Sequence, residues 1–190
     1  DEFLPVTAHG VKLLSMGLLI NESDPVAVRG PLATRYVQQF LRNVAWGDVD
    51  FLILDLPPGT GDIQLTIVQT AELDGVVVVT TPQEVALIDA RKAIGLFERV
   101  ETPILGVIEN MSYFQCPSDG KIYHIFGEGG GEREAAKLGV PLLGKIPLDI
   151  ATRSGGDEGR PVALEDPEKN PVSAAFRQVA EQCARVVLDR

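Results

Sequence analysis

The residues with the clearest chemical potential lie between positions 51 and 62, where an apolar run leads into a glycine-rich segment. The run Phe51–Leu56 contains Asp55 and continues as Pro57-Pro58-Gly59-Thr60-Gly61-Asp62. A carboxylate at a strand tip suits Mg²⁺, which prefers oxygen ligands and keeps several waters. Gly59 and Gly61 let backbone N–H groups approach a terminal phosphate and move when it leaves. The segment therefore predicts a Mg²⁺-nucleotide site, and an aspartate that only begins a tight turn is the alternative.

The elements that must position these residues can be predicted from the apolar pattern. Uninterrupted runs rich in β-branched residues are typical of strands covered on both faces. The expected strands are Val11–Ile20, Phe51–Leu56, Val76–Thr80, Ile104–Ile108 and Leu142–Ile146. Helical spacing is found at Pro31–Val44, Asp62–Leu73, Glu84–Val100, Glu132–Leu138 and Val172–Leu188. The alternation predicts an α/β fold with a mostly parallel sheet wrapped by helices, in which ligands bind beyond the carboxyl ends of the strands.

Two stretches interrupt this alternation. Residues 112–131 contain Cys116, a Pro-Ser-Asp-Gly turn signal, a short β-like run at Lys121–Phe126 and three consecutive glycines. This pattern predicts a hairpin excursion from the sheet edge. Residues 154–171 are rich in Gly, Pro and charge and predict a surface loop.

Composition narrows the class of protein. With 190 residues, 45% of them hydrophobic, the chain is expected to form a single domain over residues 1–190. A formal net charge of −10 disfavours nucleic acid and anionic membranes as partners. No apolar run approaches the roughly 20 residues of a membrane-spanning helix, and no export signal opens the sequence. The two cysteines lie far apart and form no disulfide framework, so a cytoplasmic location is expected.

Six segments together carry a resemblance to one known family, in the same order and over nearly the whole chain. They are Arg29-Gly30-Pro31, Asp55 to Asp62, Thr80 to Leu87, Glu109 to Phe114, Ile125 to Gly131, and Ile146 to Asp149. The sequence resembles the Mrp/ApbC-type deviant P-loop ATPases, which are scaffolds and carriers of iron–sulfur clusters and distant relatives of the ParA and MinD ATPases. The resemblance implies a MinD-like (SIMIBI-class) P-loop NTPase fold, ATP and Mg²⁺ as ligands, and a homodimer whose partners are apo iron–sulfur proteins or assembly factors.

The resemblance also implies roles around the phosphates. Asp55 matches the Walker-B-like aspartate that holds Mg²⁺ through water. Pro57, Pro58, Gly59 and Gly61 match the switch that senses the γ-phosphate, with Asp55 and Gly59 as the expected catalytic pair.

On the base side, the resemblance places Asn110 against the adenine edge, where a side-chain amide offers a donor and an acceptor. Pro147 and Asp149 match the loop that closes over the base. Without the family, Asn110 is better explained as an Asx-turn that ends a strand, and residues 147–149 as an ordinary strand-exit turn.

The chain departs from the family pattern at the cluster site. The family carries Cys-x-x-Cys in this stretch, and two such pairs from two subunits hold one [4Fe–4S] cluster. Here the sequence is Cys116-Pro117-Ser118-Asp119, so a carboxylate replaces the thiolate that iron–sulfur clusters favour. Cys116 and Asp119 are the candidate ligands, and a loop thiol without metal is the alternative for Cys116.

A second departure concerns the phosphate loop. No Gly-x-x-x-x-Gly-Lys-[Ser/Thr] run occurs in the sequence, although its backbone cradle and lysine neutralise the β- and γ-phosphates. We therefore expect an N-terminally incomplete nucleotide-binding domain that alone hydrolyses ATP negligibly. The expected function is an ATP-dependent iron–sulfur cluster carrier. A ParA/MinD-like partitioning ATPase without a cluster and a non-catalytic scaffold are the alternatives.

Overall fold

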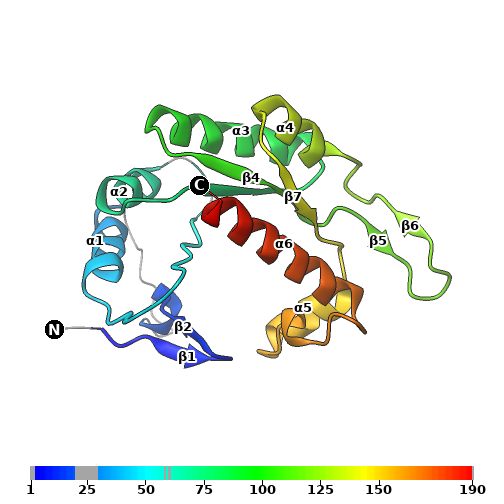
Figure 1. Ribbon diagram of the computed structural model, residues 1–190, viewed down its shortest axis with the longest axis horizontal. Coiled ribbons are helices and arrows are strands. Elements are labelled where there is room, and N and C mark those ends of the chain that lie inside the picture. Colours follow the sequence, from blue (N-terminus) through cyan, green and yellow to red (C-terminus); the bar gives the residue numbers. More distant parts are fainter. Residues whose placement is uncertain (1–2, 20–29, 58, 60, 190) are drawn as a thin grey trace. The chain divides into compact units, whose positions relative to one another are not determined.

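The computed structural model describes residues 3–19, 30–57, 59 and 61–189 of the 190-residue chain (Figure 1). The chain divides into two compact units, residues 1–73 and residues 74–190. The expectation of a single domain over residues 1–190 stays a prediction.

The second unit is built around a parallel sheet of three strands. These are β3 (Val76–Thr80), β4 (Ile104–Glu109) and β7 (Leu142–Lys145), in the order β3-β4-β7. The register aligns their carboxyl ends, since Glu109 lies opposite both Thr80 and Lys145. The three strands predicted for this part of the sequence are confirmed to within one residue.

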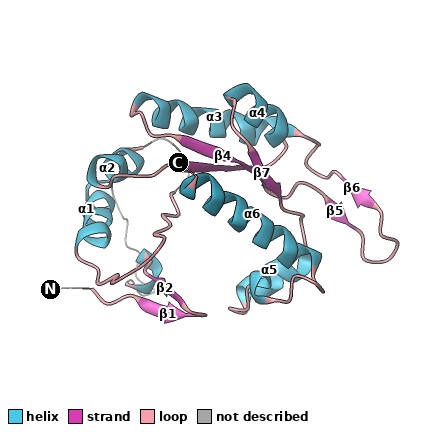
Figure 2. Cartoon of the chain, in the orientation of Figure 1, coloured by secondary structure: helices cyan, strands magenta, loops and turns pink. Residues whose placement is uncertain are grey.

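Helices cover both faces of this sheet (Figure 2). They are α3 (Glu84–Arg99), α4 (Gly130–Leu138) and α6 (Pro171–Leu188). Between β7 and α6 the chain forms α5 (Ile150–Asp157) and a short 3-10 helix η2 (Val162–Leu164), which pack on each other. Helices α3 and α4 share one face, where Val78, Ile94, Val107 and Ala135 form the buried core. Helix α6 packs on the other face against β4 and β7. The predicted α/β architecture, with helices wrapping a parallel sheet, is thereby confirmed.

The close approach of α6 to the sheet depends on a glycine in β7. A Cβ atom added at Gly144 would lie 2.5 Å from Cγ2 of Val179, a buried residue of α6. Such a distance is well inside van der Waals contact, so any larger residue would push helix and sheet apart.

Within the described part of the chain, no helix is long and apolar enough to cross a membrane.

The predicted hairpin excursion is also present. Strands β5 (Phe114–Gln115) and β6 (Ile122–Tyr123) pair antiparallel, and Figure 1 shows the hairpin extending from the end of the sheet. The turn is closed because the backbone N–H of Cys116 donates to the carbonyl of Lys121 at 2.8 Å. The paired part of β6 is shorter than the β-like run Lys121–Phe126.

The prediction of a loop over residues 154–171 is wrong in part. Helix α5 extends to Asp157 and η2 follows it. Asp149 caps α5 by accepting a hydrogen bond from the backbone N–H of Thr152 at 2.7 Å. This cap offsets the weak helix propensity of Gly155 and Gly156, which had favoured a loop.

The first unit contains two short strands and two helices. Strands β1 (Val6–Ala8) and β2 (Val11–Leu13) form an antiparallel hairpin, followed by a 3-10 helix η1 (Met16–Leu18). His9 and Gly10 join the strands with φ angles of 51° and 79°, as a two-residue hairpin turn requires. Helices α1 (Gly30–Arg42) and α2 (Asp62–Thr70) pack on each other and confirm two predicted helices.

Of the two strands predicted for the first unit, one is present only in part and the other is wrong. In the stretch Val11–Ile20, only residues 11–13 are paired as a strand, they are exposed, and residue 20 lies outside the described residues. Residues Phe51–Leu56 form no strand, and the side chain of Ile53 is 87% exposed. A strand is stable only where a neighbouring strand satisfies its backbone groups, and no described segment pairs with residues 51–57.

Candidate functional site

Asp55 lies in an irregular segment that leads into helix α2, and its side chain is exposed. The sequence predicts that Asp55 lies at the tip of a buried strand, and this prediction is wrong. The end of the segment is anchored by the buried Gln64, whose Nε2 donates to the carbonyl oxygen of Pro57 at 2.7 Å. Gly59 has a φ of 98°, which favours glycine, and Gly61 is the N-cap of α2. Pro58 and Thr60 lie outside the described residues.

The exposed carboxylate of Asp55 fits Mg²⁺. This ion is usually bound by one or two carboxylates and completes its octahedron with waters and substrate phosphates. Among the described residues, no three acidic, histidine or cysteine side chains converge as a metal-binding group. A metal at Asp55 would accordingly take its other ligands from water and phosphate. Gly59 and Gly61 carry no side chain that would keep a phosphate from the backbone N–H groups.

In the second unit, the carboxyl ends of β4 and β7 bring Asn110 and Pro147 to the same edge of the sheet. The pairing continues past the strands, since the N–H of Ile146 donates to the carbonyl of Glu109 at 2.9 Å and that of Ser112 to Ile146 at 2.9 Å. Ligands of parallel α/β sheets bind at this edge. Asp55 belongs to the other compact unit, residues 1–73.

Asn110 and Asp149 both use a side-chain oxygen locally. Oδ1 of Asn110 accepts a hydrogen bond from the backbone N–H of Met111 at 2.9 Å. Oδ2 of Asp149 accepts from both the backbone N–H and the hydroxyl of Thr152, at 2.7 and 2.9 Å. The Asn110 contact reaches the next residue and not the residue two positions on, as an Asx-turn requires, and the Asp149 contact is the N-cap of α5. An amide has two N–H donors and a carboxylate has about four acceptor positions, so each side chain retains groups for a ligand.

Cys116 and Asp119 lie together in the turn of the hairpin. The Oγ of Ser118 is 3.1 Å from the Sγ of Cys116, and this hydrogen bond lowers the pKa of the Cys116 thiol. The backbone N–H of Lys121 donates to Oδ1 of Asp119 at 3.1 Å and lowers the pKa of that carboxyl. Both groups are biased toward their anionic forms, which are the forms that bind metal.

Two other potential iron ligands, His124 and Cys183, lie outside this turn. Nε2 of His124 lies 3.6 Å from Oε1 of Glu128, in an exposed pair. Cys183 lies on α6, where burial raises the pKa of its thiol.

Glu109 is a residue to which the sequence assigns no role of its own. It is completely buried at the end of β4, and both carboxylate oxygens accept hydrogen bonds. The available signal was an acidic residue at the end of an apolar run, directly before Asn110. Charged residues are almost never fully buried without partners, so this position has a specific task.

A second buried carboxylate ties α3 to α4. Arg91 donates from Nε and Nη2 to the carboxylate of Glu134 at 2.8 to 3.0 Å, and from Nη1 to Glu84 at 2.6 Å. The guanidinium lowers the pKa of Glu134, whose side chain is 5% exposed. This ion pair fixes the two helices that carry the core on their face of the sheet.

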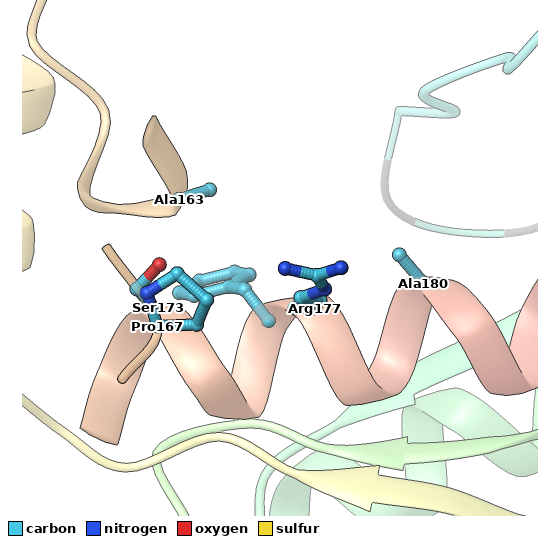
Figure 3. Close-up of a pocket in the computed structure, with 6 residues that line it drawn as sticks. Ala163, Pro167, Ser173, Arg177 and Ala180 are labelled. Atoms are coloured by element: carbon cyan, nitrogen blue, oxygen red, sulfur yellow. The ribbon is translucent and has the colours of Figure 1, made fainter. Parts of the chain in front are cut away.

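A hollow of about 400 Å³ lies along α6 (Figure 3). Its lining residues are Ala163, Pro167, Ser173, Phe176, Arg177 and Ala180. The polar groups are already engaged, since Ser173 donates to the carbonyl of Glu165 at 2.7 Å and Arg177 pairs with Glu181 at 3.1 Å. The hollow includes none of the candidate residues.

Curated relatives of the chain are iron–sulfur proteins. A family described as "ParA: NUBPL iron-transfer P-loop NTPase" matches residues 1–184. The "Iron-sulfur cluster carrier protein" of Pyrococcus horikoshii is 49% identical over 172 residues, which cover 90% of this chain and 58% of that protein. The "Iron-sulfur protein required for NADH dehydrogenase, mitochondrial" of Arabidopsis thaliana is 45% identical over 184 residues, covering 97% and 58%. The chain thus spans less than two thirds of the length of these relatives.

Solved structures show the same fold. A nucleotide-binding protein of Archaeoglobus fulgidus in complex with ADP matches with a TM-score of 0.70 and 38% identity, over 84% of this chain and 62% of that chain. The cell division ATPase MinD of Pyrococcus furiosus matches with a TM-score of 0.57 and 27% identity, over 80% and 59%. These matches confirm the MinD-like fold class and, with the family match over residues 1–184, show that the chain belongs to the NUBPL-type iron-transfer P-loop NTPases, the family of the Mrp-type iron–sulfur cluster carriers.

Proposed function

We propose that this protein is an ATP-dependent iron–sulfur cluster carrier, in which ATP binding and hydrolysis switch a homodimer between loading a cluster and passing it to apo proteins. The family match and the carrier names of its relatives support this proposal. The observation that carries it is the sheet edge of the second unit. There Asn110 and Pro147 lie at the base of the hairpin that bears Cys116.

The base of the nucleotide binds at this edge. The amide of Asn110 reads the adenine edge, and residues Pro147 to Asp149 close over the ring. Support comes from the ADP complex of the A. fulgidus protein, which is 38% identical to this chain. The helix cap formed by Asp149 keeps this loop in one conformation, so part of the ordering cost of binding is met in advance.

In the first unit, the Asp55 segment is the candidate for contacts with phosphate and Mg²⁺. Asp55 would hold Mg²⁺ through water, and residues Pro57 to Gly61 would sense the γ-phosphate, with Gly59 contributing its backbone at the reacting phosphate. When bound, Mg²⁺ supplies neutralisation of the charge on the phosphate oxygens. Because these 190 residues include no phosphate-loop lysine, we expect them alone to bind ATP weakly and to hydrolyse it negligibly.

The cluster is cargo, held by Cys116 and Asp119 from each of two copies of the chain. The lowered pKa of Cys116 favours the thiolate that iron requires. Oxygen ligands hold iron–sulfur clusters less firmly than thiolates do, which favours release to an apo protein. A cytoplasmic location stays a prediction, and the A. thaliana relative is named as mitochondrial.

An NMR titration with millimolar ADP tests the nucleotide half of the proposal. ADP should shift the amide resonances of Asn110 and Leu148, and Asn110→Ala should weaken binding about tenfold through the loss of one or two hydrogen bonds. The matched control is Asn170→Ala, which removes the asparagine that caps α6 and should leave ADP binding unchanged. Absence of shifts in the wild type, or equal ADP affinity in the two variants, contradicts the proposal.

A further inference from the structure

The hairpin that bears Cys116 is closed at its base by one buried carboxylate. Glu109 is 0% exposed. Its Oε1 accepts a hydrogen bond from the hydroxyl of Ser112 at 2.5 Å, and its Oε2 accepts one from the backbone N–H of Gly131 at 2.7 Å. Ser112 begins the excursion over residues 112–131 and Gly131 ends it. Two segments that are distant in sequence therefore meet on a single side chain.

The first turn of α4 packs against the strand ends at distances that only glycine permits. A Cβ atom added at Gly130 would lie 2.2 Å from the carbonyl oxygen of Pro82, which follows β3. One added at Gly131 would lie 2.9 Å from Cβ of Glu109. The consecutive glycines thus bring the N-terminus of α4, which carries a partial positive charge, onto the carboxylate of Glu109.

The carboxylate of Glu109 lies where the hairpin joins the candidate adenine-binding residues. Asn110 follows Glu109 directly, and its backbone N–H donates to the carbonyl of Thr80 at 2.7 Å. The first arm of the hairpin continues β4 and pairs with the segment after β7, since the N–H of Leu148 donates to the carbonyl of Tyr113 at 2.8 Å. Leu148 lies between Pro147 and Asp149. A continuous set of hydrogen bonds therefore connects the base of the hairpin to this edge of the sheet.

We infer that Glu109 is a positioning residue that clamps the base of the Cys116 hairpin to the sheet edge carrying Asn110 and Pro147, so that a displacement of this edge moves Cys116. A buried carboxylate with one partner removed keeps the full desolvation cost of the unsatisfied oxygen, so the clamp holds or fails as a whole. That nucleotide binds at the sheet edge with Asn110 and that iron binds at Cys116 rests on the proposed function. The clamp itself rests only on these contacts.

Amide hydrogen exchange tests the clamp without any ligand. Ser112→Ala removes the donor to Oε1, and we expect about tenfold faster exchange at the amides of Gly131, Cys116 and Leu148 than in the wild type. The matched control is Ser173→Ala, because Ser173 is 2% exposed, close to the 3% of Ser112, and also donates from its hydroxyl, but to the carbonyl of Glu165. It should change exchange only through global stability, as followed at the amide of Val107.

Substitutions of Glu109 show whether its hydrogen bonds hold the hairpin base or whether its side chain only fills space. The side-chain amide of the Glu109→Gln variant can still accept from Gly131 and donate to the Ser112 hydroxyl, so this variant should keep most of the protection that Glu109→Ala abolishes. The inference is overturned if Ser112→Ala speeds exchange at the three amides no more than Ser173→Ala does. That comparison stands even if Glu109→Ala fails to fold.

Alkylation of Cys116 by iodoacetamide, in a Cys183→Ala background, tests whether a ligand at the sheet edge affects Cys116. ADP should change the alkylation rate in the wild type, and Ser112→Ala should abolish this change while ADP still binds. An ADP effect that persists at full size in Ser112→Ala overturns the inference. If ADP does not bind at all, the proposed function fails, and hydrogen exchange still decides whether the clamp exists.

Discussion

Cys116 sits in a turn whose hydrogen bonds determine how readily its thiol ionises. The Ser118 hydroxyl lowers the pKa of Cys116, whereas burial raises the pKa of Cys183. At pH 7 to 8, Cys116 should therefore be alkylated faster than Cys183, because the thiolate is the nucleophile. Ser118→Ala should move the pH–rate profile of Cys116 to higher pH and leave that of Cys183 in place. Mass spectrometry after timed iodoacetamide treatment measures both rates, and superimposable profiles for the two cysteines would refute this reading.

Glu134 predicts a pH dependence of stability. Its pKa in the folded protein lies below the ordinary value of 4.5 because Arg91 donates to it. The contribution to stability is therefore fully present above the unfolded pKa and is lost as the pH falls through the folded value. Glu134→Gln should lower the free energy of unfolding by about 1 kcal/mol at pH 7, and less below pH 4, in urea titrations. The exposed Glu181→Gln is the control, and a deficit of equal size at pH 7 and pH 3 would contradict the prediction.

Single residues were predictable from the sequence only where a local pattern or the family motif marked them. Asn110 and the segment Pro147 to Asp149 were assigned in this way, and the structure brings them to one edge. The clamp at Glu109 was not predictable, because it depends on the approach of Gly131, 22 residues away. No local pattern encodes which N–H will face a buried carboxylate.

Among the elements, the packing of α6 on β7 is the most sensitive to side-chain volume. Gly144→Ala places a methyl group 2.5 Å from Val179 and should destabilise the protein by about 1–3 kcal/mol. Gly95→Ala in α3 is the matched control, because nothing lies within 4 Å of its added Cβ atom and alanine favours a helix by about 1 kcal/mol. Urea unfolding should therefore show opposite signs for the two variants. A neutral Gly144→Ala would mean that α6 does not pack as described.

The elements themselves were predictable where partners exist within the chain. The strands at 76–80, 104–109 and 142–145 pair with one another, so their apolar runs and their structure agree. The equally apolar run Phe51–Leu56 has no described pairing partner and forms no strand. Residues 154–171 show the converse failure, because a capped helix formed in spite of two glycines. The composition of a segment predicts its tendency to form a strand or a helix, and the partners it packs or pairs with decide whether that element forms.

On the scale of the whole molecule, the chain carries candidate nucleotide-binding residues and a candidate cluster ligand but spans only 58% of the P. horikoshii carrier. The function proposed for it depends most on whether Cys116 holds iron. Each copy offers one thiolate and one carboxylate in this turn, so a cluster would require two copies.

Anaerobic reconstitution with iron and sulfide tests this claim most directly. After desalting, the wild type and Cys183→Ala should retain about four iron atoms per two chains and show the broad visible absorbance of a [4Fe–4S] cluster. Cys116→Ala should retain neither, and Asp119→Ala should lose its iron faster than the wild type. Equal iron content in Cys116→Ala and Cys183→Ala would contradict the account.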